Sequence, residues 1–181
     1  MVARGVHFAI TDEQRRMLET AKDDAARVYY VREVIEEAWD EAYLQETDKA
    51  WDAIHRCLSD FPPHTEWFYP VRDELGPYAL PEDHGTYPLK LCVLGGKKLV
   101  EDESTYFIRL IEPDEVVDVA KALAPIDEAW MRRKYFHHCE DIWPEFGEED
   151  FAYTWEWFCR LRAFFDRMAG NGRAIIFTTD Q

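Results

Sequence analysis

The chain has 181 residues, 47% of them hydrophobic and 15% aromatic, which is enough apolar material to fold residues 1–181 as a single domain. Its 37 acidic and 21 basic side chains give a formal net charge of −16, which repels phosphate backbones and anionic lipids and argues against nucleic acid or membrane as partners. The apolar runs are too short to cross a bilayer and the four cysteines are too scattered for a zinc site, so we expect a cytoplasmic protein with reduced core cysteines.

The N-terminal third is predicted to contain one strand followed by helices. Alternating apolar residues indicate a strand over residues 4–10, and a capping-box pair, Thr11 with Gln14, indicates that a helix follows directly. Apolar residues then recur three and four positions apart, which predicts two or three helices with breaks near residues 23–26 and 46–48. The last of these helices has two candidate capping side chains, Thr47 and Asp48.

Residues 61–88 are predicted to form a long Pro-rich loop. They hold six of the nine prolines, and neither a helix nor a central strand tolerates that many. The aromatic side chains of the loop favour a segment that packs on the body of the protein as a structural cover. The alternative is a binding loop.

The second half of the chain is predicted to mix strands and helices. The expected elements are a hairpin of strands 89–94 and 97–100 around Gly95-Gly96, a strand 106–111, a helix from Pro113 to near Pro125, helices 127–139 and 148–168, a left-handed turn at Gly170-Asn171-Gly172 and a strand 174–178. Strands and helices do not alternate as in a doubly wound fold. We therefore predict an α+β fold in which a small mixed or antiparallel sheet of three to five strands packs against several helices.

Three stretches of the chain resemble the YfbM-like family, a bacterial family of unknown function. Residues 48–55 show the pattern Asp-Lys-x-Trp-Asp-x-x-His, residues 106–136 a strand leading into a helix with proline at its start, and residues 158–177 a helix followed by a turn and a last strand. The resemblance implies a compact α+β fold in a bacterial cytoplasm, and it brings no activity, cofactor or catalytic residue. Residues 33–45 and the Pro-rich loop depart from the family pattern and are the candidates for a function private to this chain.

The family-like helix carries the candidate site. His55 lies four residues after Trp51 and three after Asp52, so all three side chains lie near one another on the helix. Asp52 could orient His55 as a general base, which makes His55 and Asp52 the catalytic candidates. The ligand-binding candidates are Lys49, Trp51 and His55, and the positive charge of Lys49 could hold an anionic group of the ligand. The alternative is that Trp51 faces the core while Asp52 and His55 make local hydrogen bonds.

No metal and no cofactor are predicted. His137 and Asp141 are spaced so that both could reach one ion, but two ligands do not make a metal site. A polar helix end explains them as well, because histidine suits the negative end of the helix dipole.

The leading hypothesis for function is a non-enzymatic, acidic protein-binding domain. A basic protein is the expected partner, for example a toxic nuclease that the domain would neutralise as an immunity protein does. The alternative is a small-molecule-binding domain or a hydrolase-like enzyme that uses His55 as its base. A structural homo-oligomer is a third hypothesis.

Overall fold

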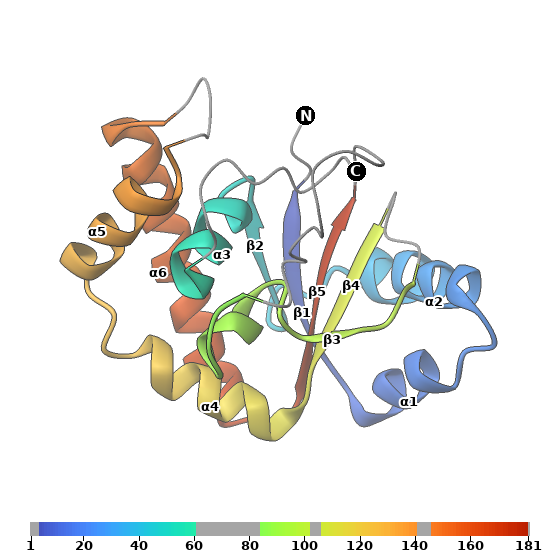
Figure 1. Ribbon diagram of the computed structural model, residues 1–181. Helices are drawn as coiled ribbons and strands as arrows, with labels where there is room; N and C mark the ends of the chain where they lie inside the picture. Colours follow the sequence, from blue (N-terminus) through green and yellow to red (C-terminus); the bar gives the residue numbers. More distant parts are fainter. Residues whose placement is uncertain (1–3, 61–83, 102–105, 141–145, 181) are drawn as a thin grey trace.

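The computed structural model describes residues 4–60, 84–101, 106–140 and 146–180, and within them the chain forms a five-stranded antiparallel sheet (Figure 1). The strand order is β2-β1-β5-β4-β3. The strands are β1 (Gly5–Ile10), β2 (Leu44–Asp48), β3 (Lys97–Lys98), β4 (Tyr106–Ile111) and β5 (Ala174–Asp180). The first and last strands are therefore neighbours at the centre of the sheet.

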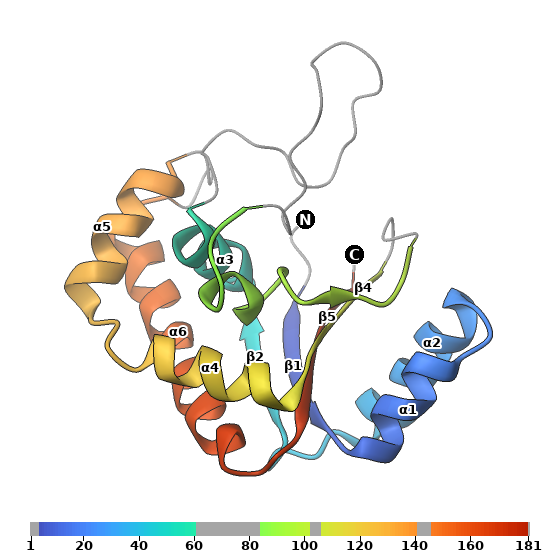
Figure 2. The same ribbon diagram turned by 60° about the horizontal axis from the view of Figure 1, so that its bottom comes forward.

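Helices cover both faces of this sheet (Figure 2). One face carries α3 (Trp51–Ser59), α4 (Pro113–Leu123), α5 (Glu128–His138) and α6 (Glu148–Ala169). The other face carries α1 (Asp12–Thr20), α2 (Asp24–Tyr30) and a π-helix (Val31–Glu36) that continues α2. In the part of the chain that is described, none of the helices combines the length and the apolar character that crossing a membrane requires.

Successive side chains of a strand point to opposite faces of the sheet, so the buried side chains form two hydrophobic cores, one on each face. The larger core lies between the sheet and α3–α6, and its fully buried members include Trp51, Phe158 and Phe165. The smaller core lies under α1 and the π-helix, where Leu18 and Ile35 pack on the opposite face of the same strands. The predicted α+β class and its antiparallel sheet are confirmed.

Local signals in the sequence placed several elements correctly. Thr11 and Gln14 form the capping box of α1, with the Gln14 amide 3.2 Å from the Thr11 hydroxyl. The break before α2 lies at residues 21–23, slightly ahead of the predicted one, and Asp23 caps α2 because its side chain accepts a hydrogen bond from the Ala26 amide at 2.8 Å. Pro113 occupies the first turn of α4. These signals act within four residues, so they need no knowledge of the fold.

The predicted hairpin around Gly95-Gly96 is wrong. Residues 89–92 form a short 3₁₀-helix (Leu89–Cys92), and β3 pairs with β4, where Lys97 lies opposite Leu110. The glycine is needed for a close approach of two backbones: a Cβ on Gly95 would lie 2.3 Å from the Lys90 carbonyl oxygen. Glycine is therefore required at position 95 by the close packing of two backbone segments, and not by a hairpin turn.

The predicted cap of α3 is also wrong, and a strand was missed beside it. The break near residues 46–48 is present, but it holds β2, which pairs with β1 at one edge of the sheet. The Thr47 hydroxyl donates to the Gly5 carbonyl at 3.0 Å, and the Asp48 carboxylate accepts from the Tyr153 hydroxyl at 2.7 Å. Both side chains therefore join elements together, and α3 begins after Ala50 without a side-chain cap. Residues 61–83 of the Pro-rich loop lie outside the described residues, so its role stays a prediction.

Candidate functional site

Helix α3, which carries the predicted site, is buried along its whole length. The Trp51 ring packs against Phe177 of β5, with 5.8 Å between the ring centroids. His55 is fully buried, and its Nδ1 accepts a hydrogen bond from the Leu94 amide at 3.4 Å. Accepting through Nδ1 places the proton of a neutral imidazole on Nε2.

The polar candidates in and just before this helix make separate contacts. The Asp52 carboxylate accepts from Arg56 Nε at 2.9 Å, which is a buried ion pair one turn along the same helix. Lys49 is exposed, and its backbone amide lies 3.3 Å from the Tyr153 hydroxyl. Trp51 thus faces the core and Asp52 makes a local contact, as the alternative interpretation expected. Ligand binding by Lys49, Trp51 and His55, and catalysis by His55 with Asp52, stay predictions.

Two further basic side chains are buried on the same sheet face, and the sequence did not single them out. His7 in β1 and Arg109 in β4 both lie opposite Phe177 in β5, so the three residues form a row across the sheet. His7 Nε2 donates to the Cys92 carbonyl at 2.8 Å, and burial lowers the pKa of its imidazole to about 4. Arg109 is 1% exposed, with its guanidinium 6.0 Å from the Phe107 ring. His7 is therefore a neutral link between the sheet and residues 92–94.

The histidines at the end of α5 contact each other and the end of α3. His138 Nε2 lies 3.2 Å from the Asp60 carboxylate, and the rings of His137 and His138 lie 4.6 Å apart. Asp141 falls outside the described residues. Within the described ranges, no group of three His, Cys, Asp or Glu side chains is placed to hold a metal ion.

A groove of about 450 Å³ lies between α1 and α2 on the opposite face of the sheet. Its apolar lining includes Met17 and Tyr29, which are 50% and 68% exposed, with Ala21 and Ala26, and its charged lining residues are Lys22 and Asp23. The sequence held a signal for this surface in the neighbours Met17 and Leu18. Adjacent positions on a helix point about 100° apart, so only one of the two could face the core, and Leu18 does.

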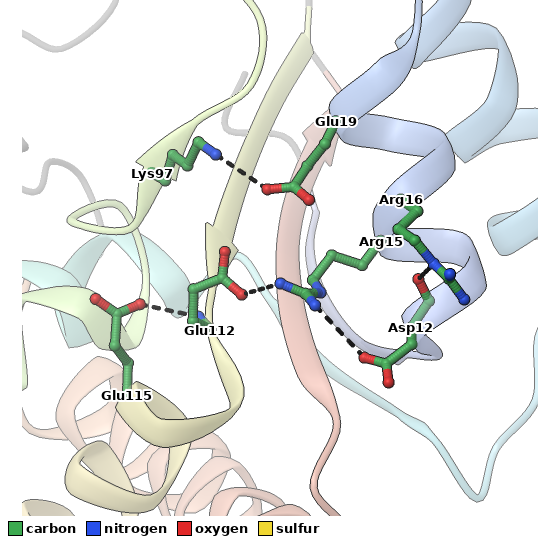
Figure 3. A network of polar contacts seen from close by, with 7 residues as sticks. All are labelled: Asp12, Arg15, Arg16, Glu19, Lys97, Glu112 and Glu115. Carbon is green, nitrogen blue, oxygen red and sulfur yellow. Dashed lines mark hydrogen bonds and ion pairs between the residues drawn. The ribbon is translucent and has the colours of Figure 1, made fainter.

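Ion pairs fix α1 to the edge of the sheet and to α4 (Figure 3). The Arg15 guanidinium lies 2.7 Å from the Glu112 carboxylate at the start of α4, and 3.7 Å from Asp12 one turn back. Lys97 of β3 lies 3.1 Å from Glu19. Helix α1, which forms one wall of the groove, is therefore held by two ion pairs, one to the start of α4 and one to β3.

The segment that contains this groove is strongly acidic. Residues 12–41 hold five basic side chains against ten acidic ones, which are Asp12, Glu13, Glu19, Asp23, Asp24, Glu33, Glu36, Glu37, Asp40 and Glu41. Five of the acidic side chains are exposed and form no ion pair with another described residue: Glu13, Glu33, Glu37, Asp40 and Glu41. Exposed apolar and acidic groups therefore occur together on this side of the molecule.

A family model described as a domain of unknown function, DUF1877, matches residues 1–178. The chain belongs to the DUF1877 family. This DUF1877 domain is also similar in structure to YfbM of Escherichia coli, a protein of unknown function, with a TM-score of 0.61. The two share 19% identity over 97% of this chain and 99% of that one, so the likeness shows the fold alone. No curated protein matches the chain. The predicted YfbM-like membership is confirmed.

The family-like stretches of this DUF1877 domain build one layer of the structure. Residues 48–55 enter α3, residues 106–136 form β4, α4 and most of α5, and residues 158–177 form most of α6 and β5. The groove between α1 and α2 lies outside all three stretches. The family model matches residues 1–178 and so covers the groove as well.

Proposed function

We propose that this DUF1877 domain binds another protein through the groove between α1 and α2, and that the occupant is a basic, amphipathic segment of the partner. The observation that carries the proposal is the combination of exposed Met17 and Tyr29 with a groove of about 450 Å³ in a segment, residues 12–41, that holds ten acidic and five basic side chains. Large exposed apolar side chains next to one another mark interaction surfaces. The acidic groups around them select a cationic partner.

The geometry supports an occupant with one apolar face. An apolar face can cover Met17 and Tyr29, while lysine or arginine side chains at its edges reach exposed carboxylates such as Glu33 and Glu37. The ion pairs that hold α1 to Glu112 and Lys97 keep one wall in place, so little ordering is needed on binding. One concrete form of this function is an immunity-type protein whose acidic surface neutralises a basic toxin.

A capture experiment with matched variants tests the proposal. The tagged protein is used to capture partners from its host lysate at moderate salt, and the basic protein recovered in stoichiometric amount is then titrated against purified variants. We expect Tyr29→Ala to weaken binding by about tenfold or more, as the loss of a central aromatic contact does. Tyr87→Ala, which removes an exposed tyrosine outside the groove, serves as the control and should leave the affinity unchanged.

The charges are tested separately from the apolar contacts. The double variant Glu33→Gln with Glu37→Gln should slow association and flatten its salt dependence, because salt screens charges on the surface. Glu149→Gln, an exposed position at the start of α6, is the matched control. A partner that binds Tyr29→Ala and the double variant as tightly as the wild type would refute the groove as the binding surface.

A second candidate function is small-molecule binding or hydrolase-like catalysis at α3. It is favoured by the burial of four basic side chains, His7, His55, Arg56 and Arg109, in a chain of net charge −16. If His55 is used, His55→Gln should abolish the thermal shift produced by any ligand found in a metabolite screen. A ligand that still stabilises His55→Gln would exclude His55 from its site.

A further inference from the structure

A second, smaller hollow of about 230 Å³ lies where β1 ends and the chain leaves the π-helix. Phe8 and Ile35 form its apolar part, and both are buried. Tyr43 and two charged side chains of opposite sign, Asp40 and Arg173, complete the lining. The hollow is separate from the groove between α1 and α2 and shares no lining residue with it.

The two charges are each held by contacts of their own. The Arg173 guanidinium lies over the Tyr43 ring, 3.6 Å from its centroid, and donates to the Ala9 carbonyl at 3.3 Å. Asp40 accepts from the Ala42 amide at 3.0 Å through one carboxylate oxygen, and its carbonyl accepts from the Tyr43 amide at 2.8 Å. Among the described residues, Asp40 and Arg173 form no ion pair with each other.

The backbone before Asp40 is also constrained. Trp39 has a φ of 38°, a left-handed conformation that is rare for a bulky side chain. Its ring packs edge-on against Phe8, with 5.9 Å between centroids. Asp40 follows Trp39 directly in the chain and lines the hollow, as Arg173 does from the turn before β5.

Two opposite charges that line one hollow beside apolar side chains, without pairing with each other, fit a ligand that carries both charges itself. We propose that this hollow binds a free aliphatic α-amino acid, with its carboxylate toward Arg173, its ammonium group toward Asp40 and its side chain toward Phe8 and Ile35. Charge-assisted hydrogen bonds to both ends would satisfy the two protein charges. The hollow is large enough for a small ligand. Its volume of about 230 Å³ is that of roughly eight water molecules in liquid water.

The test is a calorimetric titration of the purified full chain with L-leucine and with two analogues that each lack one charge. These are 4-methylpentanoate, without the ammonium group, and 3-methylbutylamine, without the carboxylate. We expect saturable binding of leucine and at least about tenfold weaker binding of each analogue, because each loses one charge-assisted contact. Absence of saturable leucine binding, or equal binding by either analogue, would overturn the proposal.

Two variants connect the binding to the hollow. Asp40→Asn keeps an acceptor for the Ala42 amide and removes only the charge, so the fold is retained while leucine affinity falls about tenfold or more. Arg173→Gln should do the same for the carboxylate end. The controls are Asp166→Asn and Arg160→Gln, exposed charges on α6. Leucine binding that Asp40→Asn and Arg173→Gln both leave unchanged would place the ligand elsewhere and refute the site. Tyr29→Ala should not affect leucine, which separates this test from that of the protein-binding groove.

Discussion

Replacing Gly5 by alanine tests the packing between the sheet and α3 at a single methyl group. A Cβ at Gly5 would lie 2.7 Å from Trp51 Cδ1 and 2.8 Å from Phe177 Cε2. Ordinary contacts between carbon atoms are about 3.5–4.0 Å, so both rings would have to move by nearly 1 Å. Neither ring has space, because Trp51 and Phe177 are fully buried and pack against each other.

Overpacking of this kind costs about 1–3 kcal/mol. For a chain of this length, each kcal/mol lowers the unfolding midpoint by about 2–4 °C, so Gly5→Ala should lower Tm by about 2–12 °C. Differential scanning calorimetry measures this loss, and tryptophan fluorescence reports the displacement of Trp51. The double variant Gly5→Ala with Phe177→Leu should recover part of the difference relative to Phe177→Leu alone.

Gly170→Ala is the matched control. Gly170 has an ordinary right-handed backbone, and its Cβ would meet only the Arg167 carbonyl oxygen at 3.8 Å. Alanine there should be neutral or slightly stabilising, because it restricts the unfolded chain more than the folded one. If Gly5→Ala unfolded at the same temperature as Gly170→Ala, the tight contact of β1 with Trp51 and Phe177 would be refuted.

Three further predictions follow from single contacts. Because burial lowers the pKa of His7 from 6.5 to about 4, the unfolded state binds a proton that the folded state rejects as pH falls through this window. Between pH 6.5 and about 4, this group should therefore lower the free energy of unfolding by about 1.4 kcal/mol for each pH unit that the pH falls. Urea titrations at pH 7 and pH 5 should show a smaller loss of stability in His7→Gln than in the wild type. Equal losses in the two proteins would contradict the buried neutral imidazole. Asp23→Ala removes the cap of α2 and should cost about 1 kcal/mol in thermal unfolding, whereas Asp23→Asn, which keeps an acceptor, should cost almost nothing. Gly95→Ala should destabilise more than Gly5→Ala, since its Cβ meets the Lys90 backbone oxygen at 2.3 Å and the backbone cannot yield as a side chain can; a mild effect would contradict the close approach of Gly95 to Lys90.

The sequence predicted those parts of the fold whose cause is local. The capping box at Thr11, the proline that opens α4 and the alternation in β4 each act through residues a few positions apart. These signals were enough for the α+β class and for most helix bounds. They failed at β2, a short strand without clear alternation whose hydrogen bonds come from β1, almost forty residues earlier.

The candidate site was predictable only in part. The spacing of Trp51 and His55 correctly put both side chains on one helix, but the sequence could not tell an exposed face from a buried one. His7 and Arg109 were missed because a single polar residue within a strand carries no signal of its own. Their common row exists only because β1 and β4 both pair with β5.

What the sequence by itself determined is therefore the set of helices, the central strands and the acidic character of residues 12–41. The order β2-β1-β5-β4-β3, the burial of α3, the groove between α1 and α2 and the placement of Asp40 and Arg173 at one hollow were decided by the tertiary structure alone. The physical reason is that a helix satisfies its hydrogen bonds within itself, whereas strands, grooves and charge pairs need partners that only the folded chain brings near.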